Sequence, residues 1–220
     1  MTTVTENKIG AGLVKELREK SGAPMGDCLK ALQECKGDIE GAFVALRKRG
    51  MASAAKKASR NTNEGAVGNY IHAGGKIGVM VELNCESDFV ARTDDFQDLL
   101  KDIAMHIAAS DPRYVKPEDV TPEDLERERE IYKAQAAATG KPPAVVEKIA
   151  EGKMAKFYEE VCLLEQPFIK EQSISIKELI AQKVGKLGEN ITVRRFARFK
   201  VGDPNWTVAT VKATADDAQA

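Results

Sequence analysis

The sequence predicts an α+β protein, in which a helical N-terminal domain precedes a small antiparallel sheet covered by helices. Short apolar stripes with helical spacing fill residues 9–49. Two alternating segments, 67–73 and 77–85, lie on either side of a Gly-Gly pair, and a third alternating segment covers 191–201. A Gly-Gly pair between alternating segments is typical of a hairpin turn. We therefore expect a sheet of three antiparallel strands.

Composition excludes several broad classes of function. Charged residues make up 30% of the chain and the net charge is -1, so no global field favours nucleic acid or a membrane surface. No apolar run approaches the roughly 20 residues that a bilayer span requires. Residues 1–8 have neither an apolar signal core nor Arg-rich transit character. We expect a cytoplasmic protein that does not bind membranes, with the plastid stroma as the alternative for a plastid-encoded chain.

The sequence contains no recognisable pattern of metal ligands or reactive cysteines. Its four cysteines form no C-x-x-C pair, and its histidines are His72 and His106. We expect reduced, mostly buried thiols, no metal site and no cofactor.

Residues 9–49 predict three short helices that must pack together, because each stripe alone buries little area. Ser21-Gly22 ends the first helix, Pro24 begins the second, and Asp38 caps the third. The arrangement, assigned to residues 1–50, resembles a ubiquitin-associated-like (UBA-like) three-helix domain, which is a common binding scaffold.

A basic segment, residues 47–60, follows with six cations and no acid. It could contact RNA phosphates, but no aromatic residue is interleaved for base stacking. A solvated linker helix or helix end is the favoured interpretation. We place a linker at 51–64, a domain boundary near residue 60, and the sheet domain at 65–202.

The segment 84–93 joins the second strand to a helix that Thr93 can cap. Asp88 and Phe89 therefore sit at a strand-to-helix corner, where side chains can project. A large ring beside a carboxylate suits insertion into another protein. The alternative is that Phe89 folds back to close the local core, and spacing alone does not decide between the two.

Catalysis receives little support. His72 lies on a predicted strand without a recognisable Ser, Cys or Asp partner motif, and a lone strand histidine is usually structural. A hydrolase using Glu86, Asp88 and His72 would lack a nucleophile motif, a metal set and a glycine-rich phosphate loop. We expect a protein that is not an enzyme.

The second half predicts two long helices around a tight turn, at about 121–161. The first is polar almost all round, which indicates a protruding antiparallel hairpin that a partner could hold. A helical pair lying flat on the sheet domain is the alternative.

The C-terminal third contains one more helix and the last expected strand. Ser175 and Glu178 form a capping box at the start of the helix. In the strand 191–201, Arg195 falls on the apolar face and Phe196 on the polar face, which hints at a second packing surface against another subunit. Residues 203–220 are predicted to be a flexible tail.

Several segments in the right order resemble the translation elongation factor Ts family. The N-terminal matches are 13–23 (LVKELREKSGA), 25–32 (MGDCLKAL) and 37–40 (GDIE), and residues 84–91 (NCESDFVA) are similar to the family's T-D-F-V loop. Later matches are 106–110, 116–120, 140–142 and 166–168. The resemblance extends to about Gly202, with Ser87 where the family usually has threonine. A Tyr-x-His hairpin, residues 70–79, runs straight into the loop, as in a short form with one core subdomain.

The resemblance implies guanine-nucleotide exchange on GDP-bound elongation factor Tu, without a specific nucleic acid. In the family the Asp-Phe tip disturbs the Mg²⁺ and phosphate elements of the GTPase. This implies a partner-binding loop of Ser87, Asp88, Phe89 and Val90.

Further implied contacts are Arg18, Met25 and His72. The short form is expected to be a homodimer that pairs open sheet faces carrying Tyr70, His72, Met80 or Phe196. A ribosome- or RNA-binding module using the segment 47–60 is the alternative function.

Overall fold

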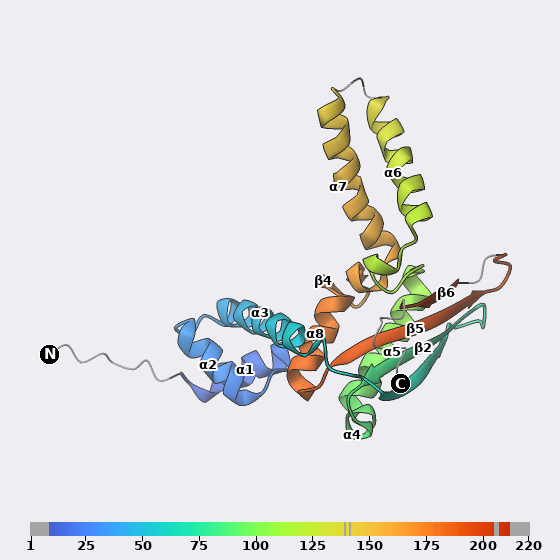
Figure 1. Cartoon of the computed structure of the whole chain (residues 1–220). Coiled ribbons are helices and arrows are strands. Elements are labelled where there is room, and N and C mark those ends of the chain that lie inside the picture. The colour runs from blue at the N-terminus through green and yellow to red at the C-terminus, as the bar shows by residue number, and fades with distance from the viewer. Residues whose placement is uncertain (1–8, 139, 141, 205–206, 212–220) are drawn as a thin grey trace.

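The computed structural model describes residues 9–138, 140, 142–204 and 207–211. A helical N-terminal region, a sheet with its covering helices, and a pair of long helices follow one another along the chain (Figure 1). The α+β class and the helical N-terminal region are as predicted.

The N-terminal region consists of α1 (Ala11–Ser21), α2 (Met25–Glu34) and α3 (Ile39–Lys57). Gly22 ends α1 in the left-handed conformation, and the Asp38 side chain accepts a hydrogen bond from Glu40 N at 3.1 Å. The three helices share a core of their own, formed by Val14, Leu17, Cys28, Ala31, Leu32 and Ala42.

The last turns of α3 lie against α8 (Ile176–Leu187), which belongs to the sheet region (Figure 1). A Cβ at Gly50 would lie 3.6 Å from the carbonyl oxygen of Ala181, so the two backbones approach closely where Gly50 meets α8. Arg47 Nη2 also pairs with Glu178 Oε2 at 2.9 Å. Residues 51–57 of the predicted linker are thus the end of a helix that packs on the sheet region.

The sheet has four antiparallel strands in the order β1-β2-β5-β6, so the prediction of three strands is wrong. The strands are β1 (Glu64–Ile71), β2 (Ile77–Cys85), β5 (Ile191–Lys200) and β6 (Thr207–Thr210). β6 lies within 203–220, which was predicted to be a tail; part of that range (205–206 and 212–220) lies outside the described residues. A strand of four residues is too short to show a clear alternation.

A β-bulge in β5 corrects the prediction for Arg195 and Phe196. Leu83 pairs with Val193 but Glu82 pairs with Arg195, so Arg194 is the extra residue. The extra residue reverses the alternation that follows it. Phe196 is therefore buried in the core, and Arg195 points to the opposite face, where its Nε is 2.6 Å from Glu82 Oε2.

The main core lies between one face of the sheet and the helices α5 (Asp94–Ser110) and α8. Thr93 caps α5 as predicted, since its hydroxyl accepts from Phe96 N at 3.3 Å. The expected apolar face of α5 is buried: Phe96, Leu99, Leu100, Ile103 and Ile107.

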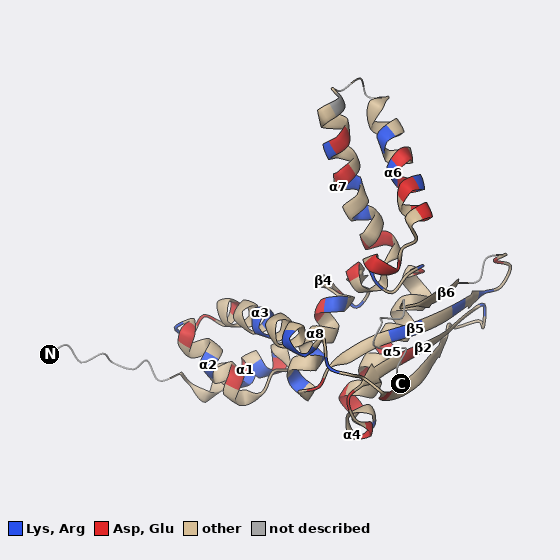
Figure 2. Ribbon diagram, in the orientation of Figure 1, with Lys and Arg blue, Asp and Glu red and all other residues tan. Residues whose placement is uncertain are grey.

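The helices α6 (Pro122–Ala137) and α7 (Pro143–Val161) lie side by side and project away from the sheet (Figure 1). Acidic and basic residues are interspersed along both helices, as the ribbon colours show (Figure 2). Their base joins a third cluster of buried residues, which includes Val120, Met154, Phe157, Val161 and Cys162. In the described part of the chain, no helix is both long and apolar enough to cross a bilayer.

Short elements complete the chain. They are α4 (Asp88–Ala91), the 3₁₀ turns Pro117–Asp119 and Leu163–Glu165, and the two-stranded pair β3 (Pro167–Phe168) and β4 (Glu171–Ser175).

Candidate functional site

The strand-to-helix corner presents Phe89 to solvent. β2 ends at Cys85, and a single helical turn, α4, follows with Ser87 as its N-cap. The Phe89 side chain is 78% exposed, whereas Ala91 is buried in the core. Phe89 therefore does not fold back to close the core. We call residues 87–90 the tip.

The tip also carries a charged pair, formed by Asp88 and Arg92. This is an i,i+4 ion pair, in which the Arg92 side chain is largely exposed and the Asp88 side chain is partly exposed. A surface pair of this kind contributes little to stability. The tip therefore offers an apolar ring beside a carboxylate that a partner could reach.

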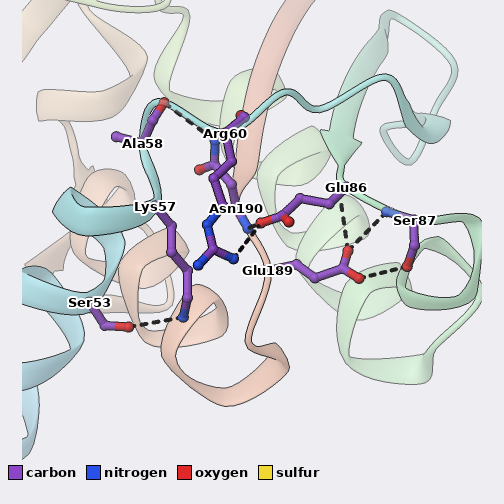
Figure 3. Close-up of polar contacts among 8 residues, drawn as sticks. All are labelled: Ser53, Lys57, Ala58, Arg60, Glu86, Ser87, Glu189 and Asn190. Carbon is purple, nitrogen blue, oxygen red and sulfur yellow. Dashed lines mark hydrogen bonds and ion pairs between the residues drawn. The ribbon is translucent and has the colours of Figure 1, made fainter.

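A carboxylate from the α8–β5 turn holds the start of the tip (Figure 3). Glu189 Oε2 accepts hydrogen bonds from Glu86 N at 3.2 Å and Ser87 N at 3.0 Å. Ser87 Oγ donates to Glu189 Oε1 at 2.6 Å and accepts from Val90 N at 3.4 Å. The same residue therefore satisfies backbone donors and orients the N-cap hydroxyl.

A second contact joins the base of the tip to the end of α3. Glu86 Oε1 accepts from Asn190 N at 2.6 Å and pairs with Arg60 Nη1 at 3.4 Å. The hydrogen bond from Asn190 N, and then the charge of Arg60, lower the pKa of Glu86. Asn190 is buried and donates through Nδ2 to the carbonyl oxygens of Ala58 and Arg60 at 3.4 and 2.9 Å (Figure 3).

The two buried thiols with a raised pKa, Cys85 beside the tip and Cys162 at the base of α7, are unsuited to nucleophilic chemistry. Burial raises the pKa of Cys85 to about 11 and that of Cys162 to about 12, so both stay protonated at neutral pH. All four cysteines are free. Within the described residues, no group of three or more His, Cys, Asp and Glu side chains could hold a metal ion.

His72 lies far from the tip in the same chain. It follows β1 at the β1–β2 turn, and the eight residues of β1 run from Ile71 back to Glu64, the partner of Cys85. Seven steps of about 3.4 Å separate the two ends of the hairpin by roughly 24 Å. Tyr70 Oη lies 3.1 Å from His72 Nδ1, which restricts the orientation of this imidazole.

Arg18 and Met25 lie on the N-terminal helices. Met25 is 54% exposed at the start of α2. Arg18 lines a cleft of about 260 Å³ together with Lys15, Glu19, Gly22 and Lys186, the last of which belongs to α8. The predicted site residues thus form three separate surfaces: the tip, the β1–β2 turn and the N-terminal helices.

The basic segment 47–60 is largely committed to contacts within the chain. Arg47 pairs with Glu178, Arg49 with Glu34 and Arg60 with Glu86. Lys57 Nζ donates to Ser53 Oγ at 3.0 Å. Cations paired in this way are less available to phosphates, which weakens the RNA-binding alternative.

Sequence reasoning missed Glu189 and Asn190. The contacts that join them to Ser87 and Glu86 bridge 102 and 104 residues. A local sequence pattern cannot predict contacts between residues so far apart in the chain. The available signal was a Gly-Glu-Asn turn between a helix and a strand, which indicates a turn but not its partner.

Comparison with known proteins agrees with the segments that resemble a family. The family model described as Elongation factor TS matches residues 51–203. A curated protein named Elongation factor Ts from Koribacter versatilis is 71% identical over 206 residues, covering 94% of each chain. A protein of the same name from Solibacter usitatus is 61% identical over 89% of this chain and 92% of its own length. Another from Carboxydothermus hydrogenoformans is 57% identical over 89% of this chain and 90% of its own length. The chain belongs to the elongation factor Ts family.

Proposed function

We propose that this protein is a guanine-nucleotide exchange factor, which binds GDP-bound elongation factor Tu and promotes replacement of GDP by GTP during protein synthesis. The observation that carries the proposal is the rigidly held tip with its exposed Phe89, in a chain of this family. Exchange requires no covalent step, so the protein would accelerate dissociation without catalysing a chemical reaction. The proposal includes a cytoplasmic location, because elongation factor Tu acts in protein synthesis there.

The tip supplies the wedge. Nucleotide in such GTPases is held by the phosphate-binding loop and by Mg²⁺ that bridges phosphate oxygens. Inserting Phe89 and Asp88 between elements of the GTPase would displace these ligands, with Ser87 and Val90 forming the base of the wedge. A carboxylate near Mg²⁺ or phosphate would add electrostatic disturbance.

The wedge alone is too weak to account for exchange. A thousandfold faster release requires the barrier to fall by about 4 kcal/mol. Burying one phenylalanine ring contributes roughly 1.5–3 kcal/mol. The remaining binding energy is assigned to the UBA-like N-terminal domain, through Arg18 and Met25, and to His72.

Coupling between the factor and nucleotide is reciprocal. If the factor weakens nucleotide binding, nucleotide weakens the binding of the factor by the same ratio. Rebinding of GTP would therefore release the factor and return it for another round.

We also propose that the protein is a homodimer, which pairs the open faces of two sheets. Val67, Ile71, Met80, Phe199 and Val208 are each at least half exposed, and register places them on the face opposite the main core. Such an apolar face is typical of an interaction site, and a twofold axis would cover both copies at once.

Stopped-flow release of fluorescent GDP tests the function. Elongation factor Tu loaded with the labelled nucleotide is mixed with excess GDP, with and without the protein, over a range of concentrations. We expect a release rate that rises with concentration to a plateau. A release rate that is independent of added protein would reject the proposed function.

A further inference from the structure

We propose that Glu189 is a positioning residue for nucleotide release, because its carboxylate fixes the direction in which the tip presents Phe89. The proposal rests on the proposed exchange function and adds to it a residue outside the tip. The contacts of Glu189 with the tip region are to Glu86 N, Ser87 N and Ser87 Oγ, so it acts through these two residues (Figure 3).

The tip needs an external support. α4 has four residues, and a single helical turn is unstable in isolation because nucleation is unfavourable. Phe89 is 78% exposed, so its own packing contributes little to holding that turn. Val90 and Ala91 pack against the core and hold the far end of the turn, so the direction of the ring also depends on the contacts at the start of α4.

Glu189 provides these contacts with both carboxylate oxygens. One oxygen accepts from Glu86 N and Ser87 N at 3.2 and 3.0 Å, and the other accepts from Ser87 Oγ at 2.6 Å. With its proton directed to Glu189, the Ser87 hydroxyl keeps a lone pair for Val90 N. Charge-assisted bonds of this kind are short and directional, so the carboxylate defines the geometry of the cap.

The support itself is firmly anchored. Gly188 ends α8 with a φ of 81°, which is the left-handed conformation that turns the chain so that Glu189 faces the tip. Asn190, the next residue, is buried and bonds to Glu86, Ala58 and Arg60. The tip is thus fixed to α8, which also carries the N-terminal helices through its contact with α3.

A positioning role and a purely stabilising role give different kinetics. Misdirecting the tip would lower the plateau of the release rate, because the wedge is needed only in the step that expels nucleotide. A loss of folded protein would instead raise the concentration required for half the plateau and leave the plateau itself unchanged. The two quantities are read from the same titration.

The experiment compares Glu189→Ala, Glu189→Gln and the matched control Glu159→Ala, which removes an exposed carboxylate of α7. We expect Glu189→Ala to lower the plateau by about tenfold or more, with the half-saturating concentration within about twofold of wild type. Glutamine keeps one carbonyl oxygen for the backbone donors, so its plateau should lie between those of alanine and wild type. Glu159→Ala should match wild type.

Amide hydrogen exchange of the free protein gives a second, independent readout. Protection of Ser87 and Val90 should fall in both Glu189 variants while protection in α5 and α8 is unchanged. Should Glu189→Ala fail to fold, Glu189→Gln carries both measurements. A wild-type plateau or wild-type protection in a folded Glu189 variant would overturn the inference. If neither wild type nor Glu159→Ala accelerates GDP release, the proposed function fails instead. The amide hydrogen-exchange data then decide by themselves whether Glu189 holds the tip.

Discussion

The guanidinium of Arg198 reaches from the core face of β5 to the C-terminal end of α5, where Nη1 lies 3.0 Å from Asp111 Oδ1. Arg198 is 5% exposed, and its Nε and Nη2 also donate to the carbonyl oxygen of Ala108 at 3.4 and 3.2 Å. Asp111 adopts the left-handed conformation, with φ 49°, just after the helix. This pair therefore ties the sheet to the end of the helix that covers it.

Replacing this buried arginine should destabilise the protein. Arg198→Met removes the partners of Asp111 and of the Ala108 carbonyl, and an unsatisfied buried acceptor costs about 1–3 kcal/mol. We expect the free energy of unfolding to fall by about that amount in urea denaturation. Arg129→Met, at an exposed ion pair of α6, is the control and should change stability by less than about 0.5 kcal/mol. Equal effects of the two substitutions would contradict the assigned role.

Removing the ring of Phe89 should impair exchange without affecting the fold. Phe89→Ala deletes an exposed side chain, so the unfolding free energy should stay within about 0.5 kcal/mol of wild type. The plateau of GDP release should fall by about tenfold or more, since the wedge is lost. Ile131→Ala, which truncates an exposed residue of α6, is the control. A wild-type plateau in a folded Phe89→Ala protein would show that the ring is not the wedge.

The N-terminal surface should govern affinity rather than the plateau. Met25→Ala and Arg18→Ala alter exposed side chains of α1 and α2, far along the chain from the tip. We expect each to raise the half-saturating concentration about fivefold, which corresponds to about 1 kcal/mol of binding. A titration of release rate against protein concentration separates this effect from that of Phe89→Ala. An unchanged half-saturating concentration in both variants would remove these residues from the interface.

The open sheet face should hold two copies together. Sedimentation equilibrium at micromolar concentration should give about twice the 24.0 kDa of one chain. Met80→Lys places a charge on the central strand of this face and should restore a mass near 24.0 kDa. Val145→Lys, on the exposed side of α7, should leave the dimer intact. A wild-type mass near that of one chain would reject the dimer.

Acid should destabilise the protein through His106, whose imidazole is buried on α5. Nδ1 accepts from Ile169 N at 3.3 Å, so Nε2 carries the proton and donates to Gln166 Oε1 at 2.9 Å. Burial lowers the pKa of His106 below its ordinary value of 6.5. Below pH 6.5 the imidazole is protonated in the unfolded chain but stays neutral in the folded chain. The free energy of unfolding therefore decreases as pH falls from 6.5 toward the pKa of His106 in the folded state.

Urea denaturation between about pH 7 and pH 5 measures this linkage. The free energy of unfolding of wild type should fall over that range, and the fall should be smaller in His106→Gln. A wild-type pH dependence in His106→Gln would show that another group is responsible.

Local features were predictable because their determinants lie within a few residues. Thr93, Asp38 and the Ser175–Glu178 capping box begin their helices as expected, and each cap bonds to a backbone group two or three residues away. The same holds for the β1–β2 hairpin, whose turn is set by consecutive glycines. These signals survive in any fold that contains the segments.

The β-bulge and the exposure of Phe89 were not predictable in this way. An extra residue at Arg194 is visible only in the pairing with β2, and it decides that Phe196 is buried. Alternation by itself placed Phe196 on the wrong face. Likewise, spacing permitted Phe89 to point inward or outward. The packing of Ala91 and Val90 against the core, together with the hydrogen bonds of Glu189 at the start of α4, directs it outward.

Periodicity and capping are short-range properties, so they were sufficient to predict the α+β class, the helix caps and the corner at Asp88 and Phe89. The fourth strand, the separation of His72 from the tip, and the contact of Glu189 with Ser87 across 102 residues became apparent only in the folded chain. Contacts of that range depend on the packing of the whole core, since no segment alone holds both partners in place.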